Sequence, residues 1–306
     1  TPTPTVTPTP TPTIVPTVAP PPAFLRVWGG GPRGSFDSWF SGTHGIAVDS
    51  SRNVYVVDRG NNRIQKFSDQ GIFITKWGTE GTGDGQFKAP YGVAVELTGN
   101  PKTGIDHYVY VTDSADSPSV QKFTGEGEFI VKWGTEGTGD GQFKAPRGIA
   151  VDSAGDLYVV DQGNSRVQKF NAEGMFLTKW GNEGTADGQF MEPYGVAVDL
   201  YGNVYLADRG NHRIQKFTDQ GVFLAAWGSK GLENGQFESP HGVAVDSAGK
   251  VYVTDFWNQR VQKFASDGLF LATWGNNGNE DGQFVLPEHL AVDQTGNIYV
   301  LDSTSR

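Results

Sequence analysis

The chain is built from short apolar runs that are separated by polar, glycine-rich turns. One unit reads RGIAVD at 147–152, DLYVVD at 156–161, RVQKF at 166–170 and MFLTKW at 175–180. Runs of this length, rich in β-branched and aromatic residues and bounded by turn residues, predict β-strands. Each unit therefore predicts four short antiparallel strands in succession.

The same unit recurs along most of the chain. If the residue before the Gly is the marker, the word G-[IV]-A-V-[DE] recurs at intervals of 47, 56, 47, 47 and 47 residues, ending at a looser copy at Glu288. An insertion of eight residues around 101–108 and one more residue within 114–119 explain the long interval. Four strands repeated at this period are typical of the blades of a β-propeller.

Side-chain size within the unit agrees with a propeller. The first run carries a small Ala, such as Ala150, which suits a strand near the axis where the sheets converge. The fourth run carries a Phe and a Trp, such as Phe176 and Trp180, and each can bury roughly 150–250 Å² between blades that splay apart. With no Cys in the chain, stability must come from such burial rather than from disulfides.

The unit resembles the NHL repeat in the pattern P-x-G-[IV]-A-V-D…G-N-[VI]-Y-V-x-D-x-x-N-x-R-[IV]-Q-K-F, over about residues 44–302. The resemblance implies an all-β, six-bladed β-propeller with four-stranded blades. We place this propeller at 24–306, with blades at about 44–78, 91–134, 147–181, 194–228, 241–275 and 289–306.

The resemblance also implies that an Asp at the end of the second strand and an Arg at the start of the third brace the turn between them. The pairs in this chain are Asp58 with Arg63, Asp161 with Arg166, Asp208 with Arg213, and Asp255 with Arg260. In the second unit Asp113 faces Ser119 instead, so we do not expect a brace there.

The last unit has only two of the four runs, PEHLAVD and NIYVLD. Residues 24–29, FLRVWG, match the fourth run of the other units, and we expect them to close the sixth blade. No run supplies the third strand, which leaves three possibilities: a three-stranded blade, a truncated chain, or a strand donated by another copy. In the last case head-to-tail addition generates a filament.

The first 23 residues have a different composition. Residues 1–22 hold eight Thr and nine of the 17 Pro, which predicts an extended polyproline-II stalk or linker. Tracts of this kind are typical of O-glycosylated spacers on exported proteins, and the alternative is a bare disordered linker. We therefore expect an extracellular or cell-surface protein, with glycosylation candidates at Thr3, Thr5, Thr7, Thr9, Thr11 and Thr13.

Charge and hydropathy limit the possible partners. The formal net charge is -10, which disfavours a phosphate backbone or an anionic lipid surface, and no apolar stretch approaches the roughly 20 residues of a membrane helix. We expect no nucleic-acid partner and no membrane insertion. The expected partners are a protein, a peptide, a glycan or another copy of the chain.

The residue before the Gly is the best candidate for a site. We expect these six positions to ring one end of the channel, because each stands at the start of an inner strand. Their side chains vary among large polar types while their neighbours hardly change: His44, Tyr91, Arg147, Tyr194, His241 and Glu288. The alternative is a solvent-facing loop position that tolerates variety.

A metal site is a second possibility at the same place. Ring closure would bring His44 and His241 beside Glu288 or His289, and two His with a carboxylate can hold zinc with one position open. Some lyases that resemble this family use a channel metal. His289 stands at an irregular Gly position, however, and no general base is evident, so we expect no catalytic residue, metal or other cofactor.

The preferred interpretation is a non-catalytic binding scaffold. The alternatives are a subunit of an extracellular homopolymeric filament, assembled through the N-terminal segment and the incomplete last blade, and a metal-dependent lyase that uses the channel mouth.

Overall fold

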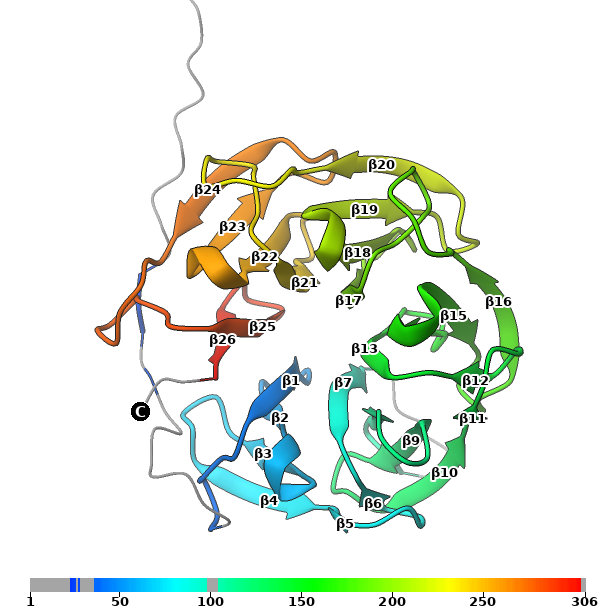
Figure 1. The fold of residues 1–306 in the computed structure, drawn as a ribbon. Helices are drawn as coiled ribbons and strands as arrows, with labels where there is room; N and C mark the ends of the chain where they lie inside the picture. Colours follow the sequence, from blue (N-terminus) through cyan, green and yellow to red (C-terminus); the bar gives the residue numbers. More distant parts are fainter. Residues whose placement is uncertain (1–22, 26, 28–35, 98–103, 304–306) are drawn as a thin grey trace, which may run out of the picture.

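The computed structural model describes residues 23–25, 27, 36–97 and 104–303. Five four-stranded antiparallel sheets surround a common axis, with the first strand of each sheet innermost (Figure 1). The chain is thus an all-β propeller. The first blade holds β1 (Thr43–Val48), β2 (Val54–Asp58), β3 (Arg63–Phe67) and β4 (Phe73–Trp77).

The other four complete blades repeat this order. They are β7 (Pro90–Glu96), β8 (Tyr108–Asp113), β9 (Ser119–Thr124) and β10 (Phe129–Trp133); β13 (Pro146–Val151), β14 (Leu157–Asp161), β15 (Arg166–Phe170) and β16 (Phe176–Trp180); β17 (Pro193–Val198), β18 (Val204–Asp208), β19 (Arg213–Phe217) and β20 (Phe223–Trp227); and β21 (Pro240–Val245), β22 (Val251–Asp255), β23 (Arg260–Phe264) and β24 (Phe270–Trp274).

Short elements lie in the connections. Two-stranded parallel sheets form from β5 (Thr79–Glu80) with β6 (Gln86–Phe87) and from β11 (Thr135–Glu136) with β12 (Gln142–Phe143). Single 3₁₀ turns follow the second strand in four blades: η1 (Arg59–Asn61), η2 (Gln162–Asn164), η3 (Arg209–Asn211) and η4 (Phe256–Asn258).

The prediction of six four-stranded blades needs a correction. The remaining sheet has two strands, β25 (Pro287–Val292) and β26 (Ile298–Asp302), and β25 contacts both β21 and β1 (Figure 1). The described residues therefore form five complete blades, not six. The reason is that β26 pairs only with β25 among the described residues, so no described segment supplies the outer strands of this sheet.

The strand expected at 24–29 is not formed by those of its residues that the structure describes. Phe24, Leu25 and Val27 lie outside any strand and are exposed. Arg26, Trp28 and Gly29 lie outside the described residues, as do the glycosylation candidates in the Thr/Pro tract. Pairing by the whole segment stays a prediction.

The inner strands of neighbouring blades approach so closely that their first Gly cannot carry a side chain. A Cβ at Gly195 would lie 2.4 Å from the carbonyl oxygen of His241, and one at Gly45 would lie 2.6 Å from that of Tyr91. The repeated Gly therefore allows the sheets to converge at the axis.

The apolar core lies between blades rather than within one blade. One cluster joins Tyr55 and Ile64 of the first blade to Val109 and Phe123 of the second, with Trp77 packed against it. Equivalent clusters join the later blades. The Phe and Trp side chains of the fourth strands thus lie where the size pattern predicts them.

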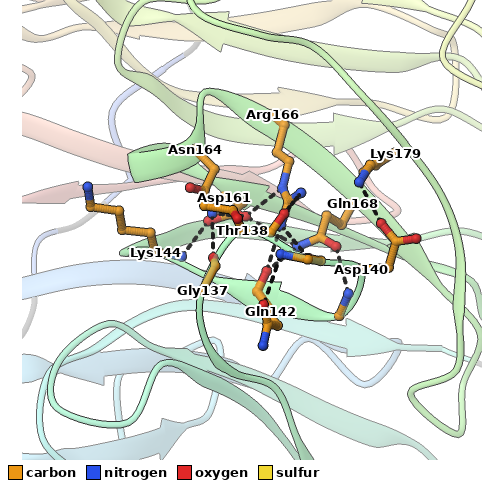
Figure 2. A network of polar contacts seen from close by, with 12 residues as sticks. Gly137, Thr138, Asp140, Gln142, Lys144, Asp161, Asn164, Arg166, Gln168 and Lys179 are labelled. Atoms are coloured by element: carbon orange, nitrogen blue, oxygen red, sulfur yellow. Dashed lines mark hydrogen bonds and ion pairs between the residues drawn. The ribbon is translucent and has the colours of Figure 1, made fainter.

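The expected Asp–Arg braces are present in all four predicted blades. Arg166 Nε donates to Asp161 Oδ2 over 2.8 Å, and the same side chain donates to the carbonyl oxygens of Thr138, Gly139 and Gln142 in the preceding loop (Figure 2). The brace therefore holds the connection between two blades as well as the turn. The other pairs, Asp58 with Arg63, Asp208 with Arg213 and Asp255 with Arg260, lie at 2.7–2.8 Å.

The second blade departs as predicted. Asp113 accepts hydrogen bonds from the backbone nitrogens of Lys88 and Ala89 but has no Arg beside it, and burial raises its pKa. The Ser119 hydroxyl is buried without a hydrogen-bond partner among the described residues. This blade therefore lacks both the 3₁₀ turn and the brace.

Candidate binding site at the mouth of the channel

Antiparallel pairing places two repeat positions at one end of the propeller. The start of each first strand pairs with the end of the second, as Pro240 does with Asp255. The residue after that Pro and the turn after that Asp therefore share one end of the channel, which we call the mouth. The six predicted site residues form the mouth cluster: His44, Tyr91, Arg147, Tyr194, His241 and Glu288.

The mouth cluster is packed rather than solvent-facing. Tyr91 stacks on His44 with ring centroids 4.3 Å apart and contacts Tyr194 edge-on at 5.5 Å. Tyr194 in turn stacks on His241 at 4.3 Å. Tyr91 and His241 are only 2% and 3% exposed. The structure thus brings the predicted residues together as a plug of rings across the axis.

One carboxylate lies within this plug. His241 Nδ1 lies 3.1 Å from Glu288 Oε2, and His44 Nδ1 lies 3.7 Å from the same atom. Burial favours a higher pKa for Glu288, but the hydrogen bond with His241 and the nearby imidazole of His44 outweigh it and lower the pKa to about 2. Burial lowers the pKa of His241. At neutral pH an ionised Glu288 therefore accepts a hydrogen bond from a neutral His241.

The plug contains two further residues, which the marker position did not identify. Phe256 of η4 stacks on His241 at 4.0 Å. His289, which occupies the position of the inner Gly, is buried with its Nε2 atom lacking a hydrogen-bond partner among the described residues. Burial lowers its pKa to about 4. Its signal in the sequence was the replacement of a repeated Gly by a large side chain.

Sequence reasoning also missed Arg59 and Arg209. Both directly follow the Asp of a second strand, and their guanidinium carbons lie 5.7 Å from the ring centroid of Tyr91 and 5.6 Å from that of Tyr194, respectively. Arg147 lies 4.1 Å from the centroid of Tyr91 and donates from Nε to Gln162. The available signal was the word DRG in the first and fourth units, together with the antiparallel pairing that brings it to the mouth.

Beneath the plug, the channel continues between the inner strands of the blades. It has a volume of about 180 Å³ and is lined by the inner-strand Val, Ala, Ile and Leu side chains and by His289. Among the described residues, no Asp, Glu, Lys or Arg side chain lines this part of the channel.

The geometry does not support the metal interpretation. His44, His241 and Glu288 do come together, but the described residues contain no group of three His, Cys, Asp or Glu side chains arranged to hold a metal ion. The imidazoles of His44 and His241 instead stack on Tyr91 and Tyr194, so we take the metal-dependent lyase no further.

Four of the repeated units match a known family. Residues 40–67, 143–170, 190–217 and 237–264 match the NHL repeat. The chain carries NHL repeats. The matched segments leave out the second unit, which has the insertion and lacks the Asp–Arg brace.

Two curated relatives are similar to this chain over less than half of its length. NHL repeat-containing protein 3 of Mus musculus is 34% identical over 145 residues, which cover 43% of this chain and 38% of that protein. The Protein brain tumor of Drosophila melanogaster is 29% identical over 131 residues, which cover 43% of this chain and 12% of that protein. The chain thus matches a minor part of each relative.

Solved structures share the fold at lower identity. A protein of unknown function from Bacteroides thetaiotaomicron superposes with a TM-score of 0.65 at 19% identity, covering 90% of this chain and 71% of that chain. Virginiamycin B lyase from Staphylococcus aureus superposes at 0.57 with 14% identity, covering 85% and 78%. At such identities the likeness concerns the propeller fold alone.

None of the helices in the described part of the chain has the length and apolarity that a membrane crossing requires.

Proposed function

We propose that the chain is a non-catalytic NHL-repeat scaffold that binds a peptide segment of a protein partner at the mouth of its channel. One observation carries the proposal: six repeat positions whose identity varies converge in a single cluster, while the residues around them repeat almost unchanged. Trp257, which is 52% exposed and packs against Phe256, offers an apolar contact beside this cluster.

The test uses exposed side chains, because substitutions within the plug would disturb the fold. Immobilised protein is probed with peptide and glycan arrays, and Trp257→Ala is compared with Tyr201→Ala. Tyr201 is 88% exposed in the turn between β17 and β18, at the opposite end of the propeller. Peptide binding that falls at least tenfold in Trp257→Ala and is kept in Tyr201→Ala supports the proposal. Ligands that bind both variants equally, or only glycans, contradict it.

We also propose that the sheet of β25 and β26 is the sixth blade of the ring. Its support is the contact of β25 with both β21 and β1. Among the described residues β26 pairs only with β25, so its outer edge can accept a strand from 24–29 of the same chain or of another copy. Sedimentation of the intact chain and of a chain without residues 1–29 distinguishes these routes, since only donation between copies predicts large assemblies that the deletion abolishes.

The Thr/Pro composition of residues 1–22 supports placement outside the cell or at its surface. Intact-mass measurement of the native protein tests this placement. Hexose on the tract supports it, and an unmodified tract on the native protein contradicts it.

A further inference from the structure

Three guanidinium groups gather at the mouth over two adjacent tyrosine rings. Arg147 lies 4.1 Å from the centroid of Tyr91 and 5.9 Å from that of Tyr194, Arg59 approaches Tyr91, and Arg209 approaches Tyr194. The two tyrosine centroids are themselves only 5.5 Å apart. Three positive charges from three different blades therefore share one small region.

Few carboxylates offset these charges. The negative charges facing this region are Glu288, buried in the plug, and Glu192, whose Oε2 lies 3.0 Å from Arg209 NH1 and whose side chain is 60% exposed. Arg59 and Arg209 each act to lower the pKa of Arg147, after burial, which is the largest cause. The mouth thus concentrates positive charge on a chain whose formal net charge is -10.

The hydrogen-bond donors of these side chains are incompletely used. Arg59 Nε is buried without a hydrogen-bond partner in the described part of the chain. Arg147 Nε bonds a neutral amide, that of Gln162, and neither Arg59 nor Arg147 forms an ion pair with any described residue. A buried donor without an acceptor is costly, so an anion that enters here would recover that free energy.

We propose that Arg59, Arg147 and Arg209 form a carboxylate-binding site, and that the carboxylate belongs to an acidic peptide. Guanidinium groups match the planar carboxylate with paired hydrogen bonds, and the tyrosine rings hold them in place beneath it. Three guanidinium groups beside two carboxylates can bind a ligand with one or two negative charges. A polyanion would be repelled by the rest of the chain, because its net charge is negative. This inference rests on the proposed function and names its ligand chemistry.

The experiment measures binding of three probes by isothermal titration calorimetry at low salt. The peptide acetyl-Gly-Glu-Glu-Gly-amide carries side-chain carboxylates, acetyl-Gly-Gln-Gln-Gly-amide is its neutral match, and inorganic phosphate reports a general anion site. The variant is Arg59→Gln with Arg209→Gln, which leaves the plug residues intact. The matched control is Lys76→Gln with Lys230→Gln, which removes the same charge from exposed lysines paired with Asp37 and Glu238.

We expect the Glu peptide to bind at least tenfold more tightly than the Gln peptide and phosphate. We also expect this preference to be lost in the mouth variant and kept in the control. Equal loss in both variants would show nonspecific attraction, and phosphate binding as tight as the Glu peptide would show a general anion site. Either result overturns the inference.

A Gln peptide that binds as well as the Glu peptide, with both losing affinity in Trp257→Ala, overturns the carboxylate site while leaving the scaffold function standing. If neither peptide binds, and the peptide arrays yield no ligand whose binding depends on Trp257, both the carboxylate site and the scaffold function are refuted.

Discussion

His289 should make this protein sensitive to mild acid. Its imidazole is buried at the position of the inner Gly, Nε2 has no hydrogen-bond partner among the described residues, and burial lowers its pKa from 6.5 to about 4. The neighbouring titratable groups are Glu288, which acts to raise this pKa, and His241 and His44, which act to lower it. Because the unfolded chain binds this proton more readily than the folded one, stability falls as the pH falls from about 6.5 to about 4.

The magnitude follows from the shift. About 2.5 pH units at roughly 1.4 kcal/mol each correspond to about 3.5 kcal/mol of unfolding free energy at neutral pH, of which about 3 kcal/mol is lost at pH 4, where His289 in the folded protein is half protonated. His289→Leu removes the titrating group and leaves a side chain of similar size that needs no hydrogen bond. We therefore expect the unfolding free energy of this variant to fall by about 3 kcal/mol less between pH 7.5 and pH 4 than that of the unchanged protein.

Urea unfolding at pH 7.5 and at pH 4, followed by tryptophan fluorescence, measures this fall in unfolding free energy for the variant and for the unchanged protein. The comparison between proteins cancels the titration of the other carboxylates and histidines to first order. A variant whose stability falls with pH as steeply as that of the unchanged protein, within about 1 kcal/mol, would refute the assignment of a buried, neutral His289.

Two further predictions concern the propeller itself. Arg166→Ala should lower the unfolding free energy by about 3–5 kcal/mol, because it leaves the Asp161 carboxylate buried without its cation. Ser119→Ala, at the equivalent place in the second blade, removes a hydroxyl that has no partner among the described residues and should cost no more than about 1 kcal/mol. Urea unfolding measures the cost of each substitution, and similar costs for the two would contradict the role of the brace. Gly195→Ala should cost about 1–3 kcal/mol or more, because its Cβ would meet the His241 carbonyl oxygen at 2.4 Å. A variant with an unchanged melting temperature would show that the inner strands are not in contact.

The strands and their order could be predicted because they depend on local pattern. The words RGIAVD, DLYVVD, RVQKF and MFLTKW each became a strand, and the Asp–Arg braces join residues only five positions apart. The last blade was harder to predict. Its missing outer strands depend on which distant segment pairs with β26, and pairing between distant segments leaves no periodic signal in the sequence.

The sequence predicted which repeat positions form the candidate site, but not how their side chains pack or which arginines join them. The marker position identified the six residues that meet at one end of the channel, but it did not indicate that their side chains stack into a plug. Arg59 and Arg209 were missed because their run lies some fifteen residues beyond the marker, and only the pairing of the first two strands brings them beside Tyr91 and Tyr194.

By itself, the sequence determined the repeat, the strands, the small inner residues and the braces, because each depends on neighbours within one unit of the chain. Only the tertiary structure decided which side chains meet at the axis. There Glu288 of the last sheet lies beside His44 of the first blade, and three guanidinium groups from three blades share two tyrosine rings. The physical reason is ring closure, which brings residues from opposite ends of the sequence together and sets their burial, and with it their pKa values and their capacity to bind.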